Sequence, residues 1–289
     1  MRPDRHALVV WCVALVGLAA PAAGQVVLRF HPRAGSLMRT QSDIDVTTTY
    51  VGLAAVPDSE TAQLTMRVNV SRRPAAPLNG RWVVQLTLDS ARATSRFGNG
   101  GRKDVSLPFD GTAVAVTVDS VMAPGGADPP LPSPPADTAR RGFTRALAPA
   151  FMLPLATKPV SPGATWAADL SVPLSDLMPP GIPGALAGPR QLVAHGTAKL
   201  DSLVPRGADT LAYVSYTGTF EPVITTSRDT TGTTTTTVRG GLAASQIWST
   251  SWSGWVSGGL HSRVELKLHA GTTDATTSAD VTARMQVRP

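Results

Sequence analysis

The sequence predicts a mainly β protein built as a long antiparallel meander. Apolar and polar residues alternate along most of the chain, segments rich in proline and glycine separate the alternating stretches, and helical spacing of apolar residues occurs in one place. Alternation with one apolar face is typical of an antiparallel sheet that has one face on a core and the other in water. We expect the meander to curl into a half-barrel, a barrel or a sandwich, with one short helix and an apolar loop in its middle.

The alternating stretches give the strands in chain order. Between residues 61 and 70 the even positions are apolar and the odd positions are polar, which is the pattern of a strand with one buried face. The same reasoning predicts strands at 42–51, 61–70, 83–90, 112–120, 210–220, 261–270 and 279–287. Turn-forming residues at 72–81, 204–209 and 228–232 each fall between two strands, as hairpin connections require.

The middle of the chain interrupts the meander. Residues 123–135, "APGGADPPLPSPP", form a proline-rich loop that cannot supply the donors of a sheet ladder. Residues 136–189 are predicted to be a helix and loop insertion, because apolar residues near 139–151 have helical spacing and residues 174–188 are apolar but broken by proline and glycine. We therefore expect one antiparallel β domain over residues 25–289 that contains this insertion.

The first 24 residues predict an export signal. Arg2 and Arg5 precede an apolar run at 7–20, and the small residues Ala22 and Gly24 suit cleavage after Gly24, with cleavage after Ala22 as the alternative. The run is shorter than the ~20 residues of a membrane span, so we expect a soluble mature chain in the periplasm or outside the cell, with no membrane span. The only cysteine, Cys12, lies in this signal and not at its cleavage point. The mature chain is therefore predicted to have no lipid anchor, disulfide or thiolate site.

The sequence offers no recognisable catalytic, metal or cofactor site. It has no phosphate-binding glycine loop, no HExxH and no GxSxG. His261 and His269 are eight residues apart, which is about 26 Å along a strand and too far for a shared metal. Asp43 and Asp45 share a strand face, but other oxygen ligands for a cation are not evident. The net charge is +6 without a run of three basic residues, so nucleic acid is not an expected partner.

Three tryptophans lie within eight positions of the segment 245–260, "SQIWSTSWSGWVSGGL". A two-residue turn at Ser253-Gly254 would place Trp252 opposite Trp255, Trp248 opposite Gly259 and Ile247 opposite Leu260. In that register the tryptophans share the polar face with His261, and the helix or the apolar loop must cover them unless they bind a ligand. Alternatively, a bulge at Gly258 and Gly259 moves Trp255 into the core. Internal cover or a bulge is favoured over a binding platform.

The layout resembles a group of exported bacterial proteins of unknown function, through the strand at 26–47, the proline turn at 159–166 and the glycine-rich hairpin at 240–268. It is also similar to the half-barrel of periplasmic lipoprotein carriers and their outer-membrane receptors. In those proteins a long antiparallel sheet surrounds an apolar hollow that helix and loop plug. The resemblance implies a plug whose Met and Leu side chains suit acyl chains, with ordinary core packing as the alternative: Phe143, Leu147, Phe151, Met152, Leu177, Met178 and Ile182.

These observations favour a non-enzymatic envelope protein that binds an apolar, lipid-like ligand or a protein partner in a curved sheet. The alternative is a surface carbohydrate-binding module that uses the tryptophan hairpin, and an uncharacterised hydrolase ranks last. No cofactor is expected. The predicted ligand-binding residues are those of the hairpin, Trp248, Trp252 and Trp255, together with six of the plug residues, namely Phe143, Leu147, Phe151, Met152, Leu177 and Met178.

Overall fold

The computed structural model describes residues 24–52, 59–105, 110–122, 153–172, 192–229, 232–271 and 273–288. Their regular structure consists of strands, and no helix long and apolar enough to cross a membrane occurs among them. The strands are β1 (Met38–Val51), β2 (Glu60–Pro74), β3 (Trp82–Phe97), β4 (Lys103–Val105), β5 (Thr112–Val118), β6 (Thr165–Val172), β7 (Leu192–Arg206), β8 (Asp209–Phe220), β9 (Val223–Asp229), β10 (Gly232–Ser249), β11 (Gly254–Ala270) and β12 (Thr273–Arg288).

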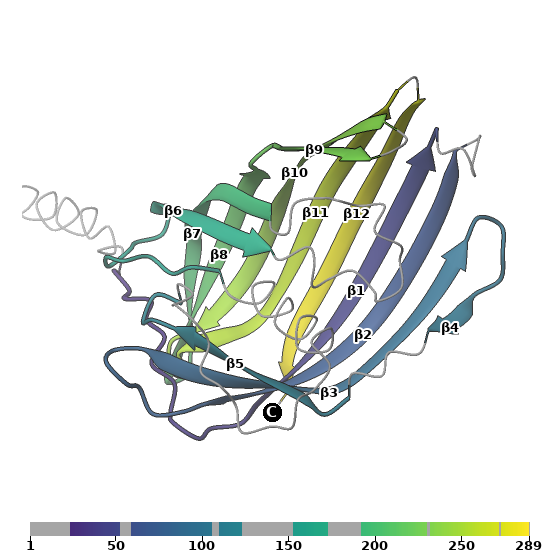
Figure 1. Ribbon diagram of the computed structural model, residues 1–289. Helices are drawn as coiled ribbons and strands as arrows, with labels where there is room; N and C mark the ends of the chain where they lie inside the picture. The colour runs from purple at the N-terminus through teal and green to yellow at the C-terminus, as the bar shows by residue number, and fades with distance from the viewer. Residues whose placement is uncertain are drawn as a thin grey trace, which may run out of the picture.

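All twelve strands belong to one antiparallel sheet, in the order β4-β3-β2-β1-β12-β11-β10-β8-β7-β6, with β5 paired to β3 and β9 paired to β10. Figure 1 shows the sheet curling around one concave side. Within the described residues the strands at its two ends do not pair with each other, so the sheet is open and not closed into a barrel. Of the three predicted architectures, the half-barrel is the one that describes it.

The predicted strands are confirmed, with β1, β2, β3, β5, β8, β11 and β12 at the expected places. Strand β2 shows the predicted alternation most clearly. Val68 and Val70 are buried and Met66 is half-buried, whereas Thr65 and Arg67 are exposed. The even positions of β2 therefore face the concave side of the sheet, as predicted.

The sequence analysis did not delimit β4, β6, β7, β9 or β10. The inner positions of β6 and β7 include the small residues Ala168, Ala194 and Ala198, all of them buried. Alanine is a weak strand former and a weak marker of a buried face, so the alternation is faint there. The predicted signal at 1–24, the helix near 139–151 and the loop at 174–188 lie outside the described residues, except for Gly24.

Among the described strands, three bulges change which residues face inward. The pairing register shifts between Asn69 and Val70, between Leu200 and Ser202, and between Ile247 and Trp248. In β3 the consequence is visible in the burial, because Leu88 faces inward before the skipped residue Asp89 and Ala91 faces inward after it. A bulge adds one residue to one strand, so it reverses the alternation beyond it and bends the strand.

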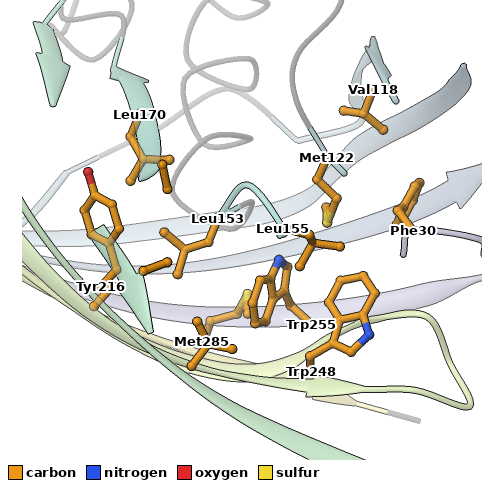
Figure 2. Packing of buried hydrophobic residues seen from close by; sticks show 14 of the residues in the cluster. Phe30, Val118, Met122, Leu153, Leu155, Leu170, Tyr216, Trp248, Trp255 and Met285 are labelled. Atoms are coloured by element: carbon orange, nitrogen blue, oxygen red, sulfur yellow. The ribbon is translucent and has the colours of Figure 1, made fainter. Parts of the chain in front are cut away.

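Two extended segments, at residues 24–37 and 153–164, cover part of the concave face. Val26 and Val160 exchange backbone hydrogen bonds of 2.8 and 2.9 Å, and the Leu155 N–H donates to Val121 O at 2.8 Å. The segments contribute Leu28, Leu153 and other buried side chains to the apolar core (Figure 2). Much of this core lies at the end of the sheet where β10 turns into β11, which we call the Trp255 end, and it continues along β7, β8 and β10 through Leu192, Phe220 and Val238. The opposite end, where β1 finishes, is the Val51 end.

A buried tyrosine depends on two glycines beside it. Gly196 and Gly218 are direct cross-strand partners, and the ring of Tyr216 lies against both. The Tyr216 hydroxyl donates to Ala194 O at 3.3 Å. Burial raises the pKa of Tyr216 to about 12, and the negative charge of Asp169 adds to the effect. The ring therefore stays neutral and inside the core at ordinary pH.

We expect Gly218→Ala to lower the free energy of unfolding by about 1–3 kcal/mol, because overpacking a close-packed core forces the neighbours to move. A methyl group at this position would lie 2.8 Å from Tyr216 Cζ. Gly259→Ala is the matched control, since its nearest neighbour would be 3.7 Å away, and it should change stability by less than about 0.5 kcal/mol. Urea unfolding midpoints measure both, and equal midpoints would contradict the packing argument.

Candidate functional site

The concave face carries a band of apolar side chains between the core and the Val51 end. They come from the neighbouring strands β1, β2, β11 and β12, and in contrast to the core they are only partly buried. The register places Val46 directly opposite Val281. We call this band the apolar track, and its residues are Val46, Met66, Leu260, Val264, Val281 and Ala283. The track is apolar surface that the rest of the described chain leaves partly accessible.

The convex face has a different character, because it carries charged and hydroxyl side chains. Arg67 Nε lies 2.6 Å from Asp43 Oδ1, and this hydrogen bond is the main reason that the pKa of Asp43 is lowered. Asp45 accepts a hydrogen bond of 2.8 Å from Thr65. These carboxylates bind neighbouring side chains, and no cluster of three or more metal-ligating residues occurs in the described part of the chain.

A group of polar side chains lies on the concave face where the core meets the track, around Met285. Ser42 and Gly258 are the two cross-strand partners of Met285. Gln246 is the partner of Gly258 and packs over it, with Cγ 2.9 Å from the position of a Cβ there. Arg72 Nη2 lies 3.5 Å from Met285 Sδ. Figure 2 shows Trp255 beside Met285. We call this group the Met285 ring, and its residues are Thr40, Ser42, Arg72, Gln246, Trp255 and Met285.

Four polar atoms of the Met285 ring are buried without hydrogen bonds. The exposed fractions are 2% for Thr40, 0% for Ser42, 4% for Gln246 and 1% for Trp255. Their polar atoms Thr40 Oγ1, Ser42 Oγ, Gln246 Oε1 and Trp255 Nε1 have no hydrogen-bond partner among the residues that the structure describes. A buried polar atom without a partner costs about 1–3 kcal/mol, so four of them in one place are a costly feature of the fold.

Arg72 brings a positive charge into the same region. Its side chain is buried, and burial lowers the pKa of Arg72 to about 10. The guanidinium therefore stays protonated at neutral pH. Arg72 thus adds hydrogen-bond donors and a positive charge to the Met285 ring.

The tryptophans are arranged differently from the prediction. Trp248 pairs with Trp255, not Trp252 with Trp255, and Ile247 pairs with Ser257, not with Leu260. Residues 250–253 form the loop, in place of a two-residue turn at Ser253-Gly254. The predicted register is wrong because the loop has four residues and not two, so that the partner of Trp255 is Trp248 and not Trp252. In addition, β11 has an extra residue, Val256, which the pairing skips.

The bulge at Val256 also decides that Trp255 faces the concave side of the sheet. Trp248 and Trp255 are each 1% exposed and pack edge to face on the concave side, with ring centroids 5.1 Å apart. The expectation that they share the polar face with His261 is therefore wrong for this pair. The alternative prediction, that a bulge moves Trp255 into the core, is confirmed. The position of the bulge was predicted wrongly, because it lies at Val256 and not at Gly258 or Gly259. Trp252 is 48% exposed, so the three indoles do not form one surface.

An aspartate orders the hairpin loop. Asp209 accepts hydrogen bonds from Ser249 Oγ at 2.6 Å, from the Ser251 N–H at 2.8 Å and from Thr250 Oγ1 at 3.1 Å. Partial burial raises the pKa of Asp209, but the hydrogen bonds together outweigh it and bring the pKa down to about 2. The carboxylate thereby ties the turn between β7 and β8 to the hairpin that carries the tryptophans.

The predicted plug residues Phe143, Leu147, Phe151, Met152, Leu177, Met178 and Ile182 lie outside the described residues. Described residues that the sequence analysis did not single out pack against the core in the same part of the chain, namely Met122, Leu153 and Leu155. The Met285 ring was missed as well. A signal for it is present in the sequence: Thr40 and Ser42 are polar, although they share a strand face with the apolar residues Ile44 and Val46.

Three histidines, His195, His261 and His269, lie beside carboxylates on the exposed surface. His195 Nδ1 is 3.1 Å from Asp169 Oδ1, and its Nε2 is 3.8 Å from Glu221 Oε2. All three side chains are more than half exposed. A hollow of about 190 Å³ lies elsewhere, lined by Thr61, Gln63, Arg96 and Gly98. The histidine cluster is thus an open surface group and not part of a pocket described in this structure.

The sequence matches no protein-family model and no curated protein sequence. A solved structure, "Lipid-protein interactions in lipovitellin", is similar to this chain with a TM-score of 0.54 and 11% sequence identity. The similarity covers 90% of this chain and 26% of the lipovitellin chain, so this protein spans about a quarter of that one's length. At this identity the likeness is one of fold.

We expect Trp255→Ala to lower the free energy of unfolding by about 3–5 kcal/mol, because it leaves a cavity in the core. Trp252→Ala should change stability by less than about 0.5 kcal/mol, since this side chain is largely exposed. Urea unfolding of the two variants measures the difference. Similar losses from both would contradict the buried Trp248–Trp255 pair.

We expect Asp209→Asn to lower the free energy of unfolding by about 1 kcal/mol at pH 7. The folded pKa lies below the ordinary value, so the carboxylate stabilises the fold above about pH 4, and this contribution is lost as the pH falls towards 2. The gap between wild type and variant should therefore shrink over that range. Asp201→Asn removes only an exposed ion pair with Lys199 and serves as the control; a gap that does not depend on pH would contradict the assignment.

Proposed function

We propose that this protein binds an apolar, lipid-like ligand on the concave face of its sheet and performs no chemistry on it. The observation that carries the proposal is the apolar track. Its side chains line one face of four adjacent strands and remain partly exposed, while the opposite face is charged and hydroxyl-rich. Apolar surface left accessible on the inner side of a curved sheet is suited to a small apolar molecule.

The fold comparison supports the same class of ligand. The similar solved structure is one of lipid–protein interactions, and it shares the arrangement of 90% of this chain. A protein partner is the other occupant that the sequence analysis named. The inner side of a curl is reached more easily by a small molecule than by a protein surface, which favours the lipid-like ligand.

We further propose that residues 1–24 direct export and that the protein acts in the cell envelope. The support is the arginine start, the apolar run and the small residues before the proposed cleavage point. The carbohydrate alternative loses its main argument, because Trp248 and Trp255 belong to the core and leave Trp252 alone at the surface.

The test is the uptake of a fluorescent long-chain fatty acid by the purified protein. We expect Val281→Lys to weaken binding at least tenfold, about 1.4 kcal/mol, because it places a charge in the apolar track. Thr282→Lys is the matched control, since it adds the same charge one residue further on the exposed convex face, and it should leave binding unchanged.

Val264→Phe is a second variant that occupies the track without adding charge, and it should also weaken uptake. Circular dichroism and urea unfolding establish that each variant is folded. If the wild-type protein takes up no fatty acid, or if the two lysine variants bind equally, the proposed site is wrong.

A further inference from the structure

We propose that the Trp255 end of the sheet docks on an anionic lipid surface. The parts that would make the contact are a group of exposed arginines, which we call the arginine rim, and the exposed apolar side chains among them. This surface lies outside the concave face, so its role does not depend on the ligand proposed there. The residues of the arginine rim, all of them exposed, are Arg33, Arg39, Arg73, Arg81, Arg206 and Arg288.

The antiparallel topology places the arginine rim at one end of the sheet. Strand β1 begins at the Trp255 end and β12 finishes there, and the turns β2–β3, β7–β8 and β10–β11 lie at the same end. In Figure 1 this end lies at the bottom, where β12 finishes beside the label C. Each arginine of the rim belongs to one of these turns or strand ends.

Three arginines of the rim lie on adjacent strands and share one face. Arg39 of β1 is the direct cross-strand partner of Arg288 of β12 and, on its other side, of Ser71 of β2. Arg73 comes two residues after Ser71, so it also faces the convex side. Like charges that lie directly opposite each other in a sheet are destabilising. No ion pair among the described residues includes any of the three arginines, so the fold holds them together against their own repulsion.

Two turns bring further arginines to this end. The Gly35 N–H donates to Pro74 O at 2.7 Å, and this hydrogen bond holds the turn that begins at Arg33 against the end of β2. In the β2–β3 turn, Arg81 exchanges backbone hydrogen bonds of 2.8 and 3.0 Å with Leu78. Both turns therefore add an exposed positive charge at the end of β2.

The carboxylates near the arginine rim already bind groups of their own surroundings. Asp89, Asp119 and Asp209 accept hydrogen bonds from Ser71 Oγ at 2.6 Å, from the Val121 N–H at 2.9 Å and from the Ser251 N–H at 2.8 Å, respectively. Further along the strands, Asp43 and Asp201 form ion pairs with Arg67 and Lys199. The Trp255 end thus carries an excess of positive charge among the described residues.

The Val51 end differs in this respect, because charges of both signs are mixed there. Its charged side chains include Arg96, Arg102 and Lys103 together with Glu60, Asp104 and Asp274. The excess of positive charge is therefore a local property of the Trp255 end and does not simply follow from the net charge of the chain. A patch of one sign attracts a surface of the opposite sign.

Exposed apolar side chains lie among the arginines. The exposed fractions are 45% for Leu37, 72% for Leu78, 42% for Val204 and 48% for Trp252. A Cβ on Gly254 would lie 3.2 Å from Met38 Cε, so the loop that carries Trp252 borders the start of β1. Asp209 ties the same loop to the β7–β8 turn, next to Arg206 and Val204. The apolar side chains and the arginines therefore belong to one continuous surface.

This combination is suited to a lipid surface. Tryptophan is enriched at the boundary between water and lipid, because its ring is apolar and its N–H is polar. Leucine side chains enter the same layer, while cationic side chains bind the phosphates of anionic lipids. A nucleic acid would use the arginines but would leave Leu37 and Leu78 in water. The exposed apolar side chains therefore favour the lipid surface.

The experiment measures the partition of the protein onto lipid vesicles by co-sedimentation. The vesicles consist of phosphatidylcholine alone or of phosphatidylcholine mixed with phosphatidylglycerol. We expect the wild-type protein to bind the anionic vesicles at least tenfold more strongly, and this preference should shrink as salt is added, because salt screens exposed charges. The neutral vesicles also measure any binding that the apolar run at 7–20 causes, and every variant shares that run.

The double variant Arg39→Gln with Arg288→Gln should lower the partition onto anionic vesicles at least tenfold, since each arginine near such a surface favours binding by about fivefold. Its urea midpoint should stay the same or rise, because two like charges that face each other are removed. The matched control is Arg96→Gln with Arg102→Gln, which removes the same charge at the Val51 end and should leave the partition almost unchanged.

Trp252→Ala tests the apolar contribution. It should lower the partition several-fold and abolish the blue shift of tryptophan fluorescence that anionic vesicles cause, because Trp248 and Trp255 are buried. Equal binding of neutral and anionic vesicles by the wild type would overturn the inference, and so would equal losses from the two arginine variants. If a DNA duplex binds as tightly as the anionic vesicles and Trp252→Ala affects neither, the arginine rim serves a nucleic acid and the inference is wrong. Fatty-acid uptake is measured without vesicles, so these outcomes leave the proposed function standing.

Discussion

A single open sheet buries only the face around which it curls, and everything else in this structure depends on how that face is covered. The segments around Val26 and Val160 pair with each other over the concave side, and Leu28, Leu153 and Leu155 complete a core at the Trp255 end. Towards the Val51 end the same face is covered less completely. One surface therefore provides both the core that stabilises the fold and the track on which the ligand is proposed to bind.

The three bulges decide how the curled sheet is lined. Each skipped residue reverses the alternation, so a strand with an inner face of even positions continues with odd ones. At Val256 this reversal brings Trp255 to the concave side opposite Trp248. The pair fills the end of the core with two large aromatic side chains and leaves Trp252 at the tip of the loop that Asp209 orders.

The Met285 ring lies at the boundary between the core and the apolar track. Its polar residues occupy inward-facing positions, where the alternation of the strands predicts apolar residues. Thr40, Ser42 and Gln246 occupy positions that the alternation assigns to apolar side chains, and they are buried as if they were apolar. The free energy that such atoms cost must be offset by the rest of the sheet, which buries many apolar side chains. Departures of this kind from the local pattern are expected at functional or strained sites.

The sequence alone determined the fold class, most long strands and the inner face of segments such as 61–70, because period-two alternation is a local property of the chain. It did not determine strands β6 and β7, the register of the tryptophan hairpin or the Met285 ring. The register depends on a four-residue loop at 250–253 and on one skipped residue, Val256. The ring joins Ser42 to Met285, more than two hundred positions apart along the chain. Only the tertiary structure decides such contacts, because they arise from pairing between distant strands that no local pattern specifies.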